Sequence, residues 1–342
     1  MELEILRMVV RGIAWKWLCA VPLIGSVASP GMAQDSIAPV PVAVAPPLAP
    51  PIAIIPAAPA ESPAADTLSS FFRPINPLLV MDADFLRHRD PALWAGLAVA
   101  ETRFVENGFA WHFFRITNSV KPDGPFWAVP HDDENAAFSV ALDGVRTHGG
   151  VAMIVSTTAD EESAAARYNL ALDGSGRIDP NRNFTGASPR FIHNFLSAPD
   201  IEKRLVLSVH TNSPGYSSGE NNCGPSSDGG KGNISIRVCD PVMQPYPSFA
   251  RAFPFNDDDT LTIVPIRPFA GLSACGKILR AADYNVVAEN IWATDGSLSN
   301  YLMLRNPAVR YVTLEAPHET PGNGETRARL KAMAEGVIAR CP

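Results

Sequence analysis

Residues 204–209 read Arg-Leu-Val-Leu-Ser-Val, an apolar run that predicts a buried β-strand, and His210 follows it directly. Similar runs lie elsewhere along the chain, and helix-like segments separate them. This alternation predicts one α/β domain with a central mixed, mostly parallel sheet flanked by helices. Ligands of such sheets bind at strand ends, so functional side chains are expected just after the strands. The other expected strands are 151–155, 261–264 and 310–314, and the expected helices are 135–142, 284–290 and 326–339.

The composition is that of a globular protein. Of the 342 residues, 46% are hydrophobic and 18% are charged, which excludes a disordered, coiled-coil or collagen-like chain for most of the sequence. The net charge is −7, so the chain lacks the basic surface that binds a phosphate backbone. We therefore expect no nucleic-acid partner.

The N-terminal residues have the pattern of a targeting signal. Arg7, Arg11 and Lys16 precede an apolar stretch over 17–27, and a small-residue cleavage site follows. The stretch is shorter than the roughly 20 residues that a bilayer crossing needs. We predict that residues 1–33 are a signal peptide and that the protein is exported, periplasmic or secreted, with no transmembrane segment after cleavage. An uncleaved membrane anchor is the alternative.

A spacer follows the signal peptide. Residues 37–66 contain ten Ala and nine Pro, a composition that lacks backbone donors and cannot pack a core. We therefore predict a disordered linker over 34–66 and a single catalytic domain over 67–342.

Four cysteines remain after the signal peptide: Cys223, Cys239, Cys275 and Cys341. An even number in an exported chain indicates two disulfides, for which three connectivities exist. We favour Cys223 with Cys239, because the segment between them is rich in Gly and Ser, and Cys275 with Cys341. A cysteine metal site is disfavoured, because no CxxC pair occurs.

Two motifs carry side chains that bind metals. His131 and Glu134 are three residues apart in His-Asp-Asp-Glu-Asn, which is expected to open a helix, and both side chains of such a turn can face one ion. His210, at the end of its strand, is a candidate third ligand. The alternatives are an acidic helix N-terminus for the first motif and a core histidine for the second.

Two more motifs complete a pattern. Asp-Pro-Asn-Arg-Asn-Phe occupies 179–184, and Glu315 ends another apolar run. The order HxxE, DxNRNF, strand-end His and strand-end Glu resembles that of the zinc metallocarboxypeptidases, in a divergent bacterial branch. The resemblance implies that His131, Glu134 and His210 bind one Zn²⁺ per chain with an open position for water.

The resemblance also implies roles for the neighbouring side chains. Asp179 would accept the free ring N–H of His131. Glu315 would be the general base that takes a proton from water and passes it to the leaving amine. Asn181 and Arg182 would hold the substrate's free carboxylate. Arg167 is the candidate for polarising the scissile carbonyl, and Arg177 competes for that role.

The chain departs from the family pattern at three places. Asp133 stands where many members carry an arginine, and Ser299 stands where an acidic residue commonly follows a Gly-Ser pair and an apolar residue. Trp292 lies where a mobile tyrosine is expected, so Trp292 becomes the candidate substrate contact, and Tyr301 is the alternative. These changes leave the metal chemistry intact but disfavour ordinary protein substrates.

The sequence thus predicts a zinc-dependent, metallocarboxypeptidase-like hydrolase that cleaves an amide bond adjacent to a free carboxylate. A peptide or peptidoglycan-derived substrate is expected from the export signal. One alternative is a zinc amidohydrolase or deacylase acting on small N-acyl amino acids. The other is an inactive domain that binds peptides or cell-wall fragments.

Overall fold

The computed structural model describes residues 71–157, 164–212, 233–238, 241–318 and 324–341. All of them belong to one compact unit, Pro63–Pro342. The predicted signal peptide, the predicted linker and the predicted Cys223–Cys239 pairing lie outside the described residues.

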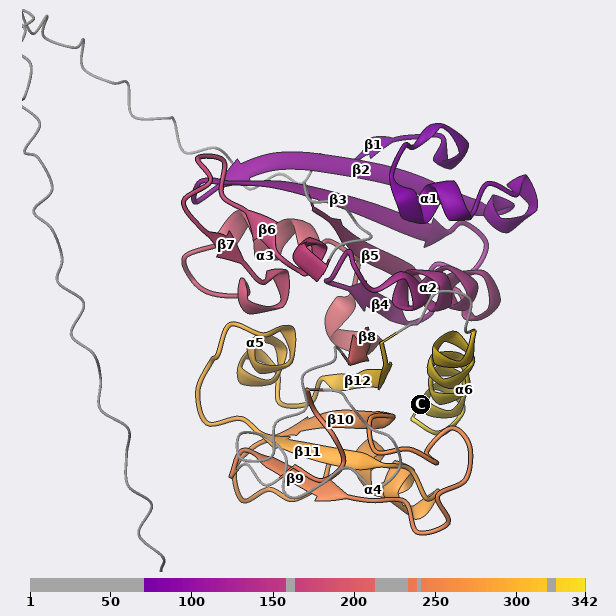
Figure 1. The fold of residues 1–342 in the computed structure, drawn as a ribbon, viewed down its shortest axis with the longest axis vertical. Helices are drawn as coiled ribbons and strands as arrows, with labels where there is room; N and C mark the ends of the chain where they lie inside the picture. The colour runs from indigo at the N-terminus through magenta and orange to yellow at the C-terminus, as the bar shows by residue number, and fades with distance from the viewer. Residues whose placement is uncertain (1–70, 158–163, 213–232, 239–240, 319–323, 342) are drawn as a thin grey trace, which may run out of the picture. The chain divides into compact units, whose positions relative to one another are not determined.

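A ten-stranded sheet forms the middle of the molecule (Figure 1). Its central strands β5, β4, β8 and β12 are mutually parallel, β11 is parallel to β10, and the other neighbouring pairs are antiparallel. The predicted class, an α/β domain with a mixed sheet flanked by helices, is confirmed. In sheet order the strands are β1 (Arg73–Pro74), β2 (Leu97–Glu106), β3 (Phe109–Asn118), β5 (Val151–Ser156), β4 (Phe126–Val129), β8 (Leu205–Asn212), β12 (Arg310–Pro317), β10 (Leu261–Ile266), β11 (Val286–Asn290) and β9 (Met243–Tyr246).

Helices cover both faces of this sheet (Figure 1). One face packs against α1, α2, α4 and α6, and the other packs against α3 and α5. Short 3₁₀ turns and a two-stranded ribbon, β6 (Asn169–Leu170) with β7 (Arg177–Ile178), join these layers. The helices are α1 (Ala83–Arg87), α2 (Asn135–His148), α3 (Pro189–Phe195), α4 (Ala274–Ala281), α5 (Leu298–Arg305) and α6 (Glu325–Arg340).

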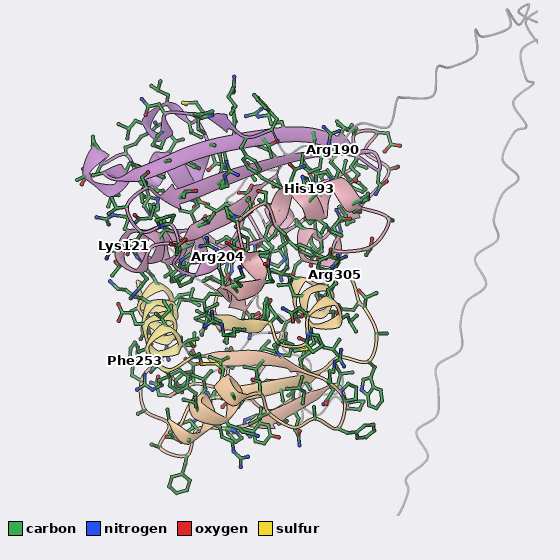
Figure 2. The ribbon with its side chains drawn as sticks, turned by 180° about the vertical axis from the view of Figure 1, so that it is seen from behind. Lys121, Arg190, His193, Arg204, Phe253 and Arg305 are labelled. Carbon is green, nitrogen blue, oxygen red and sulfur yellow. A yellow bond between two sulfur atoms is a disulfide. The ribbon has the colours of Figure 1, made fainter. Side chains whose placement is uncertain are left out.

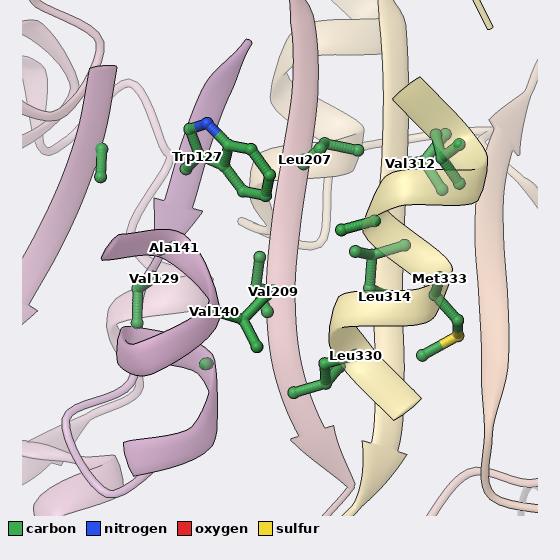
Figure 3. Close-up of a cluster of buried hydrophobic side chains, with 14 of the residues drawn as sticks. Trp127, Val129, Val140, Ala141, Leu207, Val209, Val312, Leu314, Leu330 and Met333 are labelled. Atoms are coloured by element: carbon green, nitrogen blue, oxygen red, sulfur yellow. The ribbon is translucent and has the colours of Figure 1, made fainter. Parts of the chain in front are cut away.

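The larger core lies under α2 and α6. Leu207 of β8 and Val312 of β12 are fully buried there, against Val140 of α2 and Leu330 and Met333 of α6 (Figure 3). Because successive strand residues face opposite sides of a sheet, the residues that alternate with Leu207 and Val312 face the α3–α5 side. That side is where the candidate site lies.

Arg204 fixes the start of β8. Its guanidinium is buried, and it donates to the carbonyl oxygens of Pro199, Pro122 and Gly124 at 2.6–2.8 Å (Figure 2). Pro122 and Gly124 lie just before β4, so these hydrogen bonds set β8 beside β4. The strand that carries His210 and the strand that precedes His131 are thereby held together.

The predicted helices over 135–142 and 326–339 are confirmed as α2 and α6, but the predicted helix over 284–290 is wrong. Residues Val286–Asn290 form strand β11, parallel to β10 and antiparallel to β9. Val286 and Val287 are β-branched and fully buried between the two layers, an environment that favours an extended chain.

The sequence analysis did not identify the long hairpin of β2 and β3. Its turn is Asn107-Gly108, and both residues have positive φ (54° and 80°). This dipeptide is the typical residue pair of a two-residue hairpin turn, so a local signal was present.

The predicted Cys275–Cys341 disulfide is confirmed and joins α4 to the end of α6. Among the described residues, no helix has the length and apolar character needed to cross a bilayer.

Candidate metal centre

His131 and Glu134 lie on the turn between β4 and α2. We expected them on the first turn of the helix, but α2 begins at Asn135 and Glu134 is its N-cap residue, with no side-chain capping bond. Both side chains are buried (2% and 1% exposed). The Glu134 carboxylate therefore turns toward His131 instead of capping the helix.

His210 lies within β8 and not after it, because the strand continues to Asn212. Its ring is on the same face as Ser208, and His210 Nε2 lies 2.8 Å from Ser208 Oγ. Both side chains are buried.

The three candidate ligands meet at one point. His131 Nδ1 lies 2.8 Å from Glu134 Oε1, His210 Nδ1 lies 3.3 Å from Glu134 Oε2, and the two Nδ1 atoms are 3.2 Å apart. One ligand atom from each residue falls within 4.8 Å of the others. Residues 79 positions apart in sequence thus form one buried group.

The outer nitrogen of each histidine has a partner of its own. Asp179 Oδ1 accepts from His131 Nε2 at 2.8 Å, and Ser208 lies against His210 Nε2. A proton held at Nε2 leaves the Nδ1 lone pair of each ring directed at the shared centre. Two lone pairs and a carboxylate that face one point repel each other unless a cation lies between them.

The geometry fits a metal ion. Two nitrogens bound tetrahedrally to zinc at about 2.0–2.1 Å are about 3.3 Å apart, close to the 3.2 Å between the Nδ1 atoms. Glu134 Oε2 is buried and has no hydrogen-bond partner among the described residues. Two imidazoles with one carboxylate are also a donor set of catalytic zinc sites, in which a fourth position stays open.

The electrostatics favour a positive charge at this point. Burial and Arg167 lower the pKa of His131, but the carboxylates of Glu134 and Asp179 outweigh them and raise it from 6.5 to about 9. Burial raises the pKa of Glu134, but His131 and His210 hold it well below its ordinary range.

Arg167 reaches the site, as we expected. It ends a 3₁₀ turn, Ala164–Arg167, and its Nη1 donates to Glu134 Oε1 at 2.9 Å. The guanidinium of Arg177, the other candidate, stacks 4.2 Å from the ring centre of Tyr168.

Glu315 lies on β12 beside His210 of β8, and each lies two residues before the end of its strand, whereas we expected both side chains at the strand ends. Burial, with a contribution from the Glu134 charge, raises the pKa of Glu315 from 4.5 to about 7, against the opposing effect of His210. A carboxyl group with a pKa near neutrality is suited to accept and return a proton.

A cavity of about 470 Å³ has Arg182, three residues after Asp179, in its wall. Arg182 and Trp292 line it together with Asp295 and Asn300. Arg182 follows Asp179 on the 3₁₀ turn Pro180–Arg182 and lies 3.5 Å from Asp295. The structure therefore brings Arg182 and Trp292 to one cavity wall.

Asn181 has a different position. Its Oδ1 accepts from the backbone N–H of Leu298 at 3.2 Å, so its carbonyl oxygen holds the start of α5. Asn181 does not line the cavity among the described residues.

Comparisons with known proteins give only distant similarities. No family model matches the chain, and no curated protein matches it. Solved structures that are similar to this chain include the following three. A protein of Shewanella denitrificans, provisionally named a metallopeptidase, is 14% identical, with a TM-score of 0.42 over 76% of this chain and 91% of its own.

A protein of Shewanella amazonensis with the same provisional name is 12% identical, with a TM-score of 0.40 over 80% of this chain and 99% of its own. The succinylglutamate desuccinylase of Chromobacterium violaceum is 14% identical, with a TM-score of 0.37 over 75% and 73%. At such TM-scores these similarities carry no functional inference, so function must be inferred from the site itself.

Three residues of the site were missed in the sequence. Ser208 is two residues before His210, a spacing that puts both on one strand face. Glu289 ends the apolar run of β11, which we had interpreted as a helix. Asp295 has no local signal, because only the fold brings it to Arg182.

Proposed function

We propose that this protein is an exported, zinc-dependent hydrolase of the metallocarboxypeptidase type, which cleaves an amide bond next to a free carboxylate. The observation that carries the proposal is the buried group of His131, Glu134 and His210 with the Glu315 carboxyl on the adjacent strand. The Cys275–Cys341 disulfide is consistent with an oxidising compartment outside the cytoplasm.

His131, Glu134 and His210 would hold the metal ion through Nδ1, the carboxylate and Nδ1. Zinc, when bound, supplies a Lewis acid for the scissile carbonyl and acidifies water. Asp179 and Ser208 keep the protons of the two rings on Nε2, away from the centre.

Glu315 acts as the general base. It accepts a proton from the attacking water and delivers it to the leaving amine nitrogen, which restores the carboxylate for the next cycle. Its burial supports this role, because a buried carboxyl with a pKa of about 7 exchanges protons in both directions near neutral pH.

The two arginines act on substrate charges. Arg167, held by Glu134, supplies positive charge beside the carbonyl oxygen that becomes negative during attack. Arg182 binds the free carboxylate of the substrate, which replaces Asp295 as its partner, and Trp292 forms the outer wall of the same cavity.

Cell-wall peptides are the proposed substrates, because an exported enzyme meets them and the cavity accommodates a terminal residue. The test incubates the zinc-loaded full chain with short peptides, cell-wall peptides and N-acyl amino acids, and detects products by mass spectrometry. Glu315→Gln is the control. Removal of the terminal residue by the wild type alone supports the proposal.

Two other outcomes would replace the proposal. Cleavage restricted to N-acyl amino acids would identify a deacylase. Peptide binding by both proteins with turnover by neither would identify an inactive binding domain.

A further inference from the structure

Thr157 follows the last residue of β5 and joins two segments of the candidate site. Its backbone N–H donates to Asp132 Oδ2 at 2.7 Å, and its hydroxyl oxygen lies 3.0 Å from the same carboxylate oxygen. The hydroxyl oxygen also lies 3.3 Å from the carbonyl oxygen of Ala166. Asp132 follows His131 in the chain, and Ala166 precedes Arg167. One side chain therefore contacts both the turn of the metal ligands and the turn that carries Arg167.

These contacts form a closed set around the metal-binding group. Arg167 Nη1 donates to Glu134 Oε1 at 2.9 Å, and the same oxygen lies 2.8 Å from His131 Nδ1. Thr157 completes the set, because it bonds to the residue after His131 and to the residue before Arg167. Two contacts therefore hold Arg167 against the metal ligands: its own ion pair with Glu134 and, through the backbone, the hydroxyl of Thr157.

Both partners of the hydroxyl group are buried. Asp132 is 2% exposed and Ala166 is fully buried, so their oxygen atoms are costly to bury without hydrogen bonds. The hydroxyl has a single proton, which the two oxygens share as a three-centre hydrogen bond. Because Asp132 also receives the backbone N–H, loss of the hydroxyl alone would release Ala166 more than Asp132.

We propose that Thr157 is a positioning residue of the site, whose hydroxyl group sets the place of Arg167 beside the metal ligands. This inference rests on the proposed function, because it takes Arg167 as the cation that acts on the carbonyl oxygen. That oxygen becomes negative only during attack, so a displaced guanidinium slows the chemical step more than it weakens substrate binding. The carboxylate of Glu134 also loses order, because Arg167 is one of its hydrogen-bond donors.

The first arm of the test is a double-mutant cycle on zinc affinity in the full chain. Thr157→Val removes the hydroxyl group and keeps the side-chain shape and the backbone N–H. It should weaken zinc binding by about threefold to tenfold, the range of one hydrogen bond. In the Arg167→Ala protein the same substitution should change zinc affinity by less than about twofold, because the two substitutions act on one contact and are not additive.

The second arm measures kinetics of the same four proteins on a peptide that the zinc-loaded wild type cleaves. Thr157→Val should lower kcat by about tenfold, part of the 10²- to 10³-fold loss expected when such a donor is removed, with KM changed by less than about twofold. Thr157→Ser retains the hydroxyl group and should restore most of both kcat and zinc affinity.

Thr262→Val is the matched control. Thr262 of β10 is fully buried, and its hydroxyl donates to Asn285 O at 3.0 Å. It alternates with Ile263 and shares the face of Val264, on the α2–α6 side of the sheet and opposite the candidate site. Loss of this hydroxyl-to-carbonyl hydrogen bond should leave zinc affinity and kcat unchanged. Equal losses in Thr262→Val and Thr157→Val would give Thr157 a general stabilising role and overturn the inference.

The two arms separate this inference from the proposed function. An unchanged zinc affinity in Thr157→Val, or the same loss with and without Arg167, would reject the role of Thr157 and leave the hydrolase intact. If the wild type binds zinc but cleaves no substrate, the proposed function fails and the zinc-affinity cycle alone decides the inference. A wild type that binds no zinc rejects both.

Discussion

His210 of β8 and Glu315 of β12 are register partners on adjacent parallel strands. Both side chains face the α3–α5 side of the sheet, so a candidate ligand and the candidate base are neighbours because of strand pairing alone. The β4–α2 turn then adds His131 and Glu134 to the same point. A buried proton acceptor beside three metal-binding side chains is the basis of the predictions that follow.

Metal content should depend on each candidate ligand. We expect one zinc per chain in the dialysed protein and less than a tenth of that in His131→Ala, Glu134→Ala and His210→Ala. Asp179→Asn keeps all three metal donors but replaces the charged acceptor of His131 by a neutral amide, so the zinc affinity should fall by about 10- to 100-fold. Elemental analysis and zinc titration provide the measurement, and full metal content in all three alanine variants would refute the site.

Arg182 should affect only substrates that carry the free carboxylate. Arg182→Ala should lower kcat/KM by about 10- to 100-fold, because a charge-assisted hydrogen bond is lost. Amidation of the same substrate should reduce wild-type turnover similarly and should reduce turnover by the variant far less. Arg177→Ala, which removes the guanidinium stacked on Tyr168, is the control and should behave as wild type. Equal losses on amidation in wild type and Arg182→Ala would exclude the role.

Gly296 should tolerate no side chain. Its φ is +83°, and a Cβ would lie 2.3 Å from Arg182 O. Gly174, in the turn between β6 and β7, has a similar φ of +72° but open space around it. Gly174→Ala should cost about 1 kcal/mol for the left-handed backbone, and Gly296→Ala should cost at least about 3 kcal/mol because the clash is added.

Denaturant unfolding measures both variants. Gly296→Ala should also weaken carboxylate binding, because Arg182 must move to admit the methyl group. Equal stability losses in the two variants would mean that the loop adjusts without strain.

The free energy of unfolding should decrease as the pH rises, because Glu289 loses its proton. Burial, the largest effect, raises its pKa from 4.5 to about 7, so the folded state keeps a proton that the unfolded state releases. The resulting stabilisation is complete below pH 4.5 and is lost as the pH rises through 7, which amounts to about 3 kcal/mol. Glu289→Gln removes this dependence.

The measurement is the difference in unfolding free energy between wild type and Glu289→Gln at several pH values. This difference cancels the other titrating groups. The wild type should lose stability relative to the variant as the pH rises, and a constant difference would show that Glu289 is already ionised in the folded protein.

The Cys275–Cys341 disulfide should contribute strongly to stability. It closes a loop of 66 residues, which corresponds to about 4 kcal/mol of chain entropy in the unfolded state. The Cys275→Ser, Cys341→Ser double variant and the reduced wild type should therefore unfold at similar, lower denaturant concentrations. If the reduced protein keeps its original midpoint, the bond does not stabilise the native chain.

Local sequence determined where several helices, strands and turns of this protein lie along the chain. The 3.6-residue periodicity of α2 and α6, the Asn107-Gly108 hairpin turn and the apolar runs of β5, β8, β10 and β12 depend on neighbouring residues, so their positions follow from the chain itself. The same holds for the side chains that bind metals, because imidazole and carboxylate groups are evident in any conformation.

Only the tertiary structure decided how these parts combine. The run over 284–290 became a strand because β9 and β10 pair with its two edges and the cores on opposite faces of the sheet bury Val286 and Val287. His131 and His210 meet through the pairing of β4 with β8, and Glu289 and Asp295 share a cavity with Arg182 through the joining of two distant loops. Strand register and charge balance arise from contacts between residues far apart in sequence, so folding alone fixes them.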